Sequence, residues 1–187
     1  GLWGETVSFQ VAYTGDFVMR ERLDVRVVSE LAEHVRVRTV EMVPVGRATN
    51  GIVDDNYLKT ISGLYPDLLK DLKDGKVIVY SRQWRSLWVD VDITNEIPAG
   101  EYEIELQLIK EGEVVCSAKQ KVTVIGTELP KLDIMHTEWM HADCLADYYH
   151  VEVFSEEHWK LLENYFQEYV KRDCNMMLTP LFTSPLD

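Results

Sequence analysis

The feature that most constrains the fold is an alternation of apolar and polar residues that recurs along the first two thirds of the chain. In residues 6–13 the apolar side chains of Val7, Phe9, Val11 and Tyr13 alternate with polar ones. A period of two is typical of a β-strand with one face in the core. The same pattern predicts six further strands, at residues 23–28, 35–43, 76–80, 87–93, 102–109 and 114–125.

Short turn signals separate these segments. Pro98-Ala99-Gly100 interrupts the pattern, and Glu111-Gly112-Glu113 is short enough to close a hairpin. Hairpins join antiparallel neighbours, and sheets with one apolar face bury it by packing face to face. Residues 1–128 are therefore predicted to form an antiparallel β-sandwich.

Residues 46–75 break the strand pattern. They contain turn-forming pairs such as Asn50-Gly51 and Asp54-Asp55, and four leucines that we expect to pin the segment onto the core: Leu64, Leu68, Leu69 and Leu72. A long structured excursion of this kind is often functional.

The pattern changes after Gly126. Leu129-Pro130 marks a boundary, and residues 132–135 form an apolar run without alternation, which is typical of a buried strand in a parallel sheet. Residues 129–187 are therefore predicted to form a second, α/β domain.

A helix follows in this second domain. Ser155 is the expected N-cap, apolar residues recur at helical spacing as far as Lys171, and Asn175 is expected to end the helix in the left-handed conformation. Residues 176–178 begin a second apolar run. The order strand, helix, strand predicts a β-α-β unit with parallel strands.

The charge and cysteine content exclude several classes of partner. A net charge of -13 disfavours nucleic acid and anionic membrane surfaces, and no apolar run is long enough to span a bilayer. Cys116, Cys144 and Cys174 indicate neither a disulfide framework nor a zinc ribbon. A reducing, cytoplasmic location fits best, although a chain that starts Gly1-Leu2-Trp3 suggests a trimmed N-terminus.

Three segments of the second domain carry a family resemblance. They read His-Thr-Glu-Trp-Met-His-Ala-Asp at 136–143, Phe-Ser-Glu-Glu-His-Trp at 154–159 and Asn-Met-Met-Leu-Thr-Pro-Leu-Phe-Thr-Ser-Pro-Leu-Asp at 175–187. They closely resemble the start of the barrel in proteins with the domain of unknown function 4091, which is related to glycoside hydrolase family 123. Residues 4–10, 65–69 and 98–102 resemble the sandwich domain of the same family.

The resemblance implies a β-sandwich packed on a (β/α)8 catalytic barrel, of which this chain would hold only the first β-α-β unit. It also implies hydrolysis of β-linked N-acetylgalactosamine with the acetamido group of the substrate as nucleophile, assisted by an adjacent Asp-Glu pair. In the family that pair lies on a later strand than the chain reaches at Asp187. No catalytic residue is therefore assigned, the fragment is expected to be inactive, and Asp54-Asp55 and Glu156-Glu157 are interpreted as solvated or capping charges.

Candidate substrate-binding residues follow the two expected barrel strands, because active sites are built at the carboxyl ends of such strands. An indole can stack on a sugar ring while His, Thr and Asp bind its hydroxyls. The predicted residues are His136, Trp139, His141, Asp143, Thr179, Phe182 and Asp187. The alternative is that Trp139 packs the barrel against the sandwich and the histidines hold their own loop.

Two other sites are weighed against this one. His136, His141, Asp143 and Cys144 suggest a zinc site, but their spacing is not His-x-x-x-His, and no metal or cofactor is expected. Alternatively, the chain is a non-catalytic carbohydrate-binding module whose sandwich strand near 84–92 carries the site. We favour core or interdomain packing for Trp84 and Trp88, with Asp90 and Asp92 facing solvent.

The second domain is also expected to need a packing partner. Its helix offers a wide apolar face, and its two strands have unpaired edges. The face consists of Trp159, Leu162, Phe166 and Tyr169. It is predicted to pack on the sandwich or on a second copy of the chain.

Overall fold

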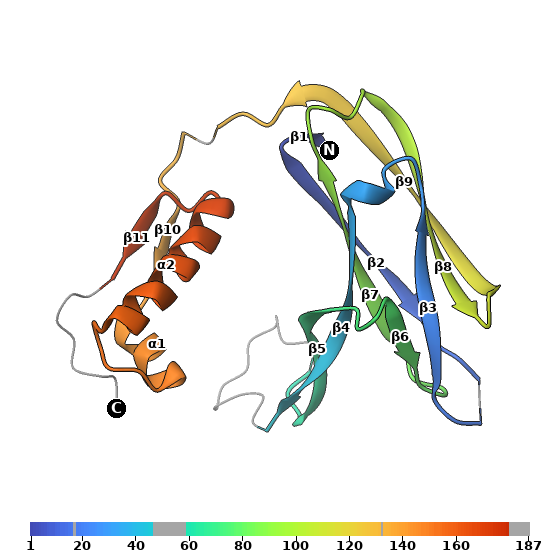
Figure 1. The fold of residues 1–187 in the computed structure, drawn as a ribbon, viewed down its shortest axis with the longest axis horizontal. Helices are drawn as coiled ribbons and strands as arrows, with labels where there is room; N and C mark the ends of the chain where they lie inside the picture. The colour runs from blue at the N-terminus through green and yellow to red at the C-terminus, as the bar shows by residue number, and fades with distance from the viewer. Residues whose placement is uncertain (17, 47–58, 132, 180–187) are drawn as a thin grey trace. The chain divides into compact units, whose positions relative to one another are not determined.

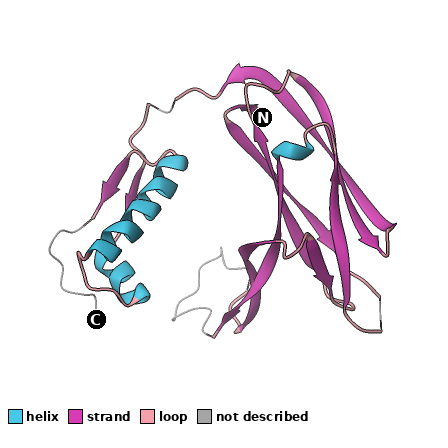
Figure 2. Ribbon diagram, viewed as in Figure 1, coloured by secondary structure: helices cyan, strands magenta, loops and turns pink. Residues whose placement is uncertain are grey.

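The computed structural model describes residues 1–16, 18–46, 59–131 and 133–179. The chain divides into two compact units, Gly1–Leu129 and Pro130–Asp187, one residue later than the boundary drawn from the sequence. The first unit is built of strands with one short helical turn, η1 (Ala32–His34), and the second combines helices with two short strands (Figures 1 and 2).

Two sheets make up the described part of the first unit. The five-stranded sheet has the order β1 (Leu2–Trp3), β9 (Glu113–Glu128), β8 (Gly100–Lys110), β3 (Glu21–Val28) and β6 (Lys76–Val79). The four-stranded sheet has the order β2 (Glu5–Tyr13), β7 (Arg85–Ile93), β4 (Val35–Val45) and β5 (Gly63–Asp71). Neighbouring strands are antiparallel except at one edge, where β1 runs parallel to β9.

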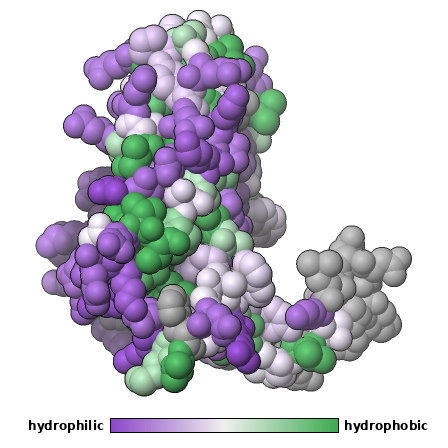
Figure 3. Space-filling model, turned by 90° about the vertical axis from the view of Figure 1, so that its right-hand side faces the viewer, coloured by the Kyte–Doolittle hydropathy of each residue, from purple (hydrophilic) through white to green (hydrophobic). Residues whose placement is uncertain are grey.

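The core lies between the two sheets. In β7 the inward positions Leu87, Val89, Val91 and Ile93 are all buried, as the alternation requires. One core cluster joins Tyr13 and Leu87 of the four-stranded sheet to residues of β3, β6 and β8 in the other. Hydrophilic side chains cover much of the outer surface (Figure 3). The seven strands predicted from the alternation are confirmed.

Strands β1 and β5 were not predicted. β1 has only two residues, and β5 contains Pro66, which lacks the N–H that a central strand must donate. The proline is tolerated because β5 is an edge strand, and the pairing with β4 shifts register between Glu41 and Met42.

Of the four leucines in residues 46–75 that were expected to contact the core, two are largely exposed. Leu64 and Leu68 are 61% and 56% exposed, so the expectation that they pin the segment is wrong. Leu69 is half-buried, and Leu72 packs against the core cluster that contains Tyr13. Asp54-Asp55 lies outside the described residues.

The ionisation of Tyr13 makes the stability of the sandwich depend on pH in the alkaline range. Burial raises its pKa to about 12 from 10.0, with Arg85 opposing and Glu41 reinforcing the shift. Between these two pH values the unfolded chain ionises before the folded one, so the contribution of Tyr13 to stability is full below pH 10 and is lost as the pH rises toward 12.

We expect Tyr13→Phe to make the unfolding free energy fall less steeply over this alkaline range than in the unchanged protein. Urea unfolding at successive pH values measures the slope. An unchanged slope in the Phe variant would contradict the assignment to Tyr13.

The second unit contains the predicted β-α-β arrangement. Its elements are β10 (Thr137–Trp139), α1 (Ala142–Tyr149), α2 (Glu156–Lys171) and β11 (Met176–Leu178). β10 and β11 are parallel, with Thr137 opposite Met176. The start of α2 is confirmed, because the Ser155 hydroxyl accepts a hydrogen bond from the N–H of His158 and Glu156-Glu157 lies in the first turn.

Three local expectations are corrected. The first strand begins at Thr137, whereas Ile134 and Met135 precede it and are 64% and 76% exposed. The left-handed residue after α2 is Asp173, with φ of 56°, and not Asn175. Helix α1 was not predicted, because its only buried residue is Ala146 and no run of large apolar side chains marks it.

Asn175 instead joins the amino ends of the two strands. Its side chain accepts a hydrogen bond from the N–H of His136 at 3.0 Å and donates one to the carbonyl of Ile134 at 2.9 Å.

Among the helices that the structure describes, none has the length and apolar character needed to span a bilayer.

Candidate functional site

The candidate site lies at the carboxyl ends of β10 and β11. Trp139 is the last residue of β10, and Thr179 follows the last residue of β11. The N–H of Met140 donates to the carbonyl of Leu178 at 3.0 Å, which holds the two strand ends together. The indole of Trp139 is exposed, at 75% of its maximum, so a ligand can reach it.

His141 and Asp143 continue from this strand end into α1. His141 is the N-cap residue, but its side chain makes no capping hydrogen bond, and Asp143 accepts one from the N–H of Cys144 at 3.1 Å. Both side chains are half-buried. Met140 between the strand and the helix is buried and anchors the connection.

Thr179 places a polar group at the end of the second strand. Its hydroxyl oxygen is buried and has no hydrogen-bond partner among the residues that the structure describes. Buried hydroxyls nearly always find a partner. Among the described residues the Thr179 hydroxyl is therefore a buried and unsatisfied polar group at the strand end.

His136 lies at the opposite end of β10, which corrects its grouping with Trp139. Its ring Nε2 is 3.2 Å from a carboxylate oxygen of Glu138. Both side chains line a cavity of about 290 Å³ together with Tyr165, Tyr169 and Arg172 near the end of α2. Successive strand residues face opposite sides, so Trp139 points away from this helix-covered face.

The residues weighed as a zinc site are spread along the same strand and the helix that follows it. His136 is separated from His141 and Asp143 by the length of β10. Within the described ranges no group of three or more His, Cys, Asp or Glu side chains is placed to hold a metal ion. Two further predicted site residues, Phe182 and Asp187, lie outside the described residues.

His158 supports the loop between the two helices, a role that the sequence did not reveal. It is fully buried, its Nδ1 accepts a hydrogen bond from the N–H of Phe154 at 2.9 Å, and its Nε2 donates one to the carbonyl of Ala142 at 2.7 Å. The ring thereby ties the start of α1 to the start of α2. The sequence signal that could have indicated this role is the position of His158 three residues after the N-cap Ser155.

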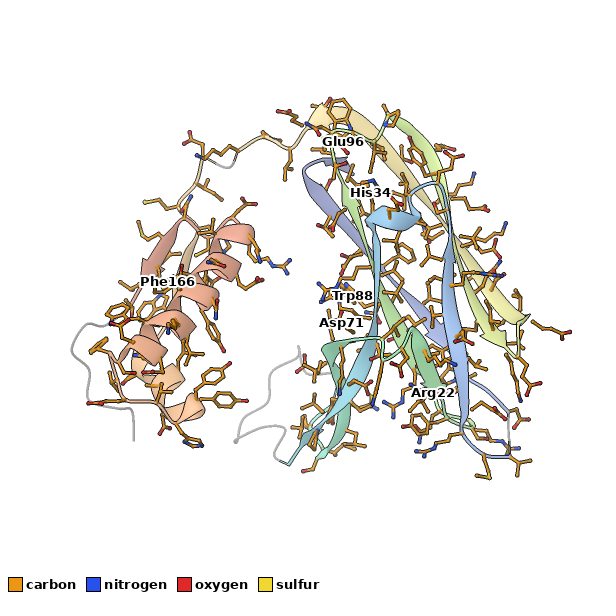
Figure 4. All side chains as sticks on the ribbon, in the orientation of Figure 1. Arg22, His34, Asp71, Trp88, Glu96 and Phe166 are labelled. Atoms are coloured by element: carbon orange, nitrogen blue, oxygen red, sulfur yellow. The ribbon has the colours of Figure 1, made fainter. Side chains whose placement is uncertain are left out.

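The apolar face of α2 is partly uncovered. Leu162 is buried, whereas Trp159, Phe166 and Val170 are 50%, 36% and 71% exposed and line a groove of about 510 Å³. Figure 4 labels Phe166 on this helix. Self-association through this face stays a prediction.

On the sandwich, the expectation that Asp90 faces solvent is wrong. Asp90 is on the outer face of β7 but is only 8% exposed, because Ser8, Trp88 and Arg38 all hydrogen-bond to its carboxylate. Burial alone would raise its pKa, but these hydrogen bonds and the charge of Arg38 outweigh burial and hold the pKa below its usual value. Asp92 is exposed, as predicted.

The two tryptophans near this strand differ in their surroundings. The indole N–H of Trp88 donates to Asp90 at 2.7 Å, and the side chain is half-buried, which matches the packing role. Trp84 is 72% exposed and was not expected to be.

Comparisons with known proteins bear on the strand-end site. The family model described as "Glycoside hydrolase 123, catalytic domain" matches residues 139–187. The match begins at Trp139, and its described part takes in α1, α2 and β11. No curated protein matches the chain.

A solved structure of a family 123 glycoside hydrolase from Clostridium perfringens is similar in fold. The TM-score is 0.66 at 16% sequence identity, over 91% of this chain and 30% of that one. The family model covers the C-terminal part of the chain, and the structural similarity shows a shared fold. The chain thus spans less than a third of the length of its structural relative.

Proposed function

We propose that the chain contributes an N-terminal β-sandwich and the first strands of a (β/α)8 barrel to a glycoside hydrolase. The observation that carries the proposal is the family match from Trp139 onward, over the unit whose parallel strands end at the candidate site. Barrel hydrolases build their active sites at such strand ends. The proposal includes a relationship to proteins with the domain of unknown function 4091.

The proposed substrate is an N-acetylhexosamine glycoside, of the N-acetylgalactosamine kind. The solved relative was studied for glycolipid glycan hydrolysis, and the sequence resemblance implies this substrate class. In the proposed complex the exposed indole of Trp139 stacks on the apolar face of the sugar. The hydroxyl of Thr179 and the carboxylate of Asp143 bind sugar hydroxyls.

The residues of this chain are proposed to bind the sugar and not to transfer protons. Substrate-assisted hydrolysis of this kind uses an adjacent Asp-Glu pair in the resembling family, and no Asp is followed by Glu anywhere in the 187 residues. General acid catalysis needs a proton donor within hydrogen-bond reach of the leaving oxygen. We therefore expect this polypeptide alone not to turn over an aryl β-N-acetylgalactosaminide.

Trp139→Ala is expected to weaken binding of methyl β-N-acetylgalactosaminide about tenfold, because sugar stacking on the indole is lost. The measurement is titration of the isotope-labelled chain, followed by NMR through the backbone amide signals of β10 and α1, which both variants retain. Trp84→Ala is a matched control, since the two side chains are 72% and 75% exposed.

The Trp84 variant should bind within about twofold of the unchanged chain, because Trp84 is on neither of the two strands that end at the proposed site. A larger loss with Trp84→Ala than with Trp139→Ala would contradict the proposal and favour a carbohydrate-binding sandwich.

A further inference from the structure

A cleft within the sandwich unit has a composition unlike the rest of the chain. It has a volume of about 590 Å³ and is lined from both sheets, with Arg22 of β3 and Asp71 of β5 on different walls (Figure 4). Volumes of this size accommodate small-molecule ligands.

Basic residues are concentrated in the lining. The whole chain has 19 Lys and Arg against 32 Asp and Glu, whereas the lining has six basic residues and three acidic ones. The six are Arg20, Arg22, Lys70, Lys73, Lys76 and Arg85. An acidic protein thus presents a locally positive cleft, which attracts anions.

Ion pairs with residues outside the lining neutralise most of its negative charge. Two of the three lining carboxylates pair with cations outside the lining, Asp71 with Arg36 at 2.9 Å and Glu21 with Lys110 at 3.2 Å. On the basic side, Arg22 pairs with Asp74 and Lys76 with Asp24.

Four lining cations are left over. Among the described residues Arg20, Lys70, Lys73 and Arg85 take part in no ion pair, and Glu41 is the one lining carboxylate that also takes part in none. The cleft therefore has positive charge that an anionic ligand can neutralise.

Arg85 is the most informative of these cations. Arg85 is half-buried, and its guanidinium lies 5.1 Å from the centre of the Tyr80 ring. Within the described ranges its one hydrogen bond to a side chain, at 3.3 Å, is to the neutral Gln83. A half-buried charge without a counter-ion is unfavourable unless something compensates it. The hydroxyl of Tyr13 is in the same lining and can donate a hydrogen bond to an anion.

We propose that this cleft binds a short acidic oligosaccharide that carries sulfate or carboxylate groups. The requirement for negative charge follows from the cleft alone, while the choice of a saccharide rests on the proposed function. Arg85 binds the anionic group bidentately, and Lys70 and Lys73 bind it from the rim. The rings of Tyr13 and Tyr80 give the apolar surface that a sugar needs.

The ligand must be short. A long polyanion such as nucleic acid would extend from the cleft onto a chain whose net charge is -13, and the repulsion would offset the local attraction. A disaccharide or trisaccharide keeps its charge within the cleft.

The test is calorimetric titration of the whole chain with a sulfated disaccharide of uronate and N-acetylgalactosamine. The comparison probes are inorganic sulfate and a neutral disaccharide of the same linkage, which has a hexose in place of the uronate and no sulfate. We expect the sulfated disaccharide to bind at least about tenfold more tightly than either, with a Kd that rises with salt concentration. Equal binding of the neutral disaccharide would overturn the charge requirement, and equal binding of inorganic sulfate would overturn the saccharide.

Variants locate the site. Arg85→Gln is expected to weaken binding about tenfold or more, since a bidentate charged contact is lost. Lys73→Gln tests the exposed rim without touching the core, and Lys73→Arg should retain binding. Lys121→Gln, an exposed lysine of β9 outside the lining, is the control.

Equal affinities of the Lys121, Lys73 and Arg85 variants would overturn the proposal. The amide signals of β10 and α1 with the neutral glycoside report separately on the strand-end site, so failure of one site is distinguishable from failure of the other.

Discussion

Replacing Asp90 with Ala is expected to lower the unfolding free energy of the sandwich by about 3 kcal/mol, because it leaves the guanidinium of Arg38 nearly buried without a partner. The two side chains are only 11% and 19% exposed and form an ion pair on the outer face of the four-stranded sheet. Arg38 already has one buried nitrogen, Nε, without a hydrogen-bond partner in the described part of the chain.

The expected loss is large because the carboxylate of Asp90 links side chains from three neighbouring strands. Asp90 is on β7, the hydroxyl of Ser8 reaches it from β2 at 2.7 Å, and Arg38 reaches it from β4. Removing the carboxylate therefore leaves the half-buried indole N–H of Trp88 and the nearly buried guanidinium of Arg38 without their partner, while the exposed Ser8 hydroxyl can bond to water. Each unsatisfied buried donor costs about 1–3 kcal/mol, and relaxation of Arg38 toward solvent recovers part of the total.

Asp92→Ala is the matched control, two residues along the same strand and on the same face. Its carboxylate is exposed and accepts one hydrogen bond, from Thr6 at 2.7 Å. We expect it to cost less than about 1 kcal/mol. Amide exchange in β2, β7 and β4 measures both effects within the sandwich. Equal losses for the two variants would show that the network around Asp90 is not what stabilises the sheet.

The pH dependence gives a second readout. Because the folded pKa of Asp90 is lowered, its contribution to stability is present above the unfolded pKa of roughly 3.9 and is lost as the pH falls through the folded value. The difference between the unchanged protein and Asp90→Ala should therefore shrink in acid. The double variant with Arg38→Met should be more stable than Asp90→Ala alone, since no charge is then left unpaired.

Asp90 also shows what alternation can and cannot predict. The period of two assigned it correctly to the outer face of β7, because side-chain direction is a local property of a strand. Its burial depends on which residues of β2 and β4 are its neighbours, and that pairing joins positions 82 and 52 residues away. No local pattern contains this information.

The candidate site was predictable to a similar extent. The β-α-β unit and the positions of Trp139, His141, Asp143 and Thr179 near strand ends followed from local signals. His136 was misplaced because the apolar run at 132–135 was taken for the strand, whereas pairing of Thr137 with Met176 defines where the strand lies. A short strand that shifts along the sequence moves each residue to another end or face.

His158→Ala is expected to destabilise the second unit by about 3 kcal/mol, through a cavity and two lost hydrogen bonds. The imidazole is 0% exposed, and both ring nitrogens are used, one as acceptor for Phe154 and one as donor to Ala142. Phe154 has φ of 62°, a conformation that a non-glycine residue adopts at a cost, so its N–H needs this partner to hold the turn before α2.

Two further variants separate the causes. His158→Phe keeps most of the volume but loses both hydrogen bonds, and we expect it to cost nearly as much as His158→Ala, since the bonds are buried. His141→Ala, in the same unit, removes a half-buried imidazole that makes no capping bond and should cost less than about 1 kcal/mol.

Amide exchange in α1 and α2 measures the loss in the second unit directly, and exchange in the sandwich strands serves as the internal reference. If His158→Phe were as stable as the unchanged protein, the ring would be filling space and not holding the loop. If it is destabilised, the connection from Trp139 through α1 to α2 depends on His158, and sugar binding at Trp139 should weaken in that variant even though the residue lies outside the site.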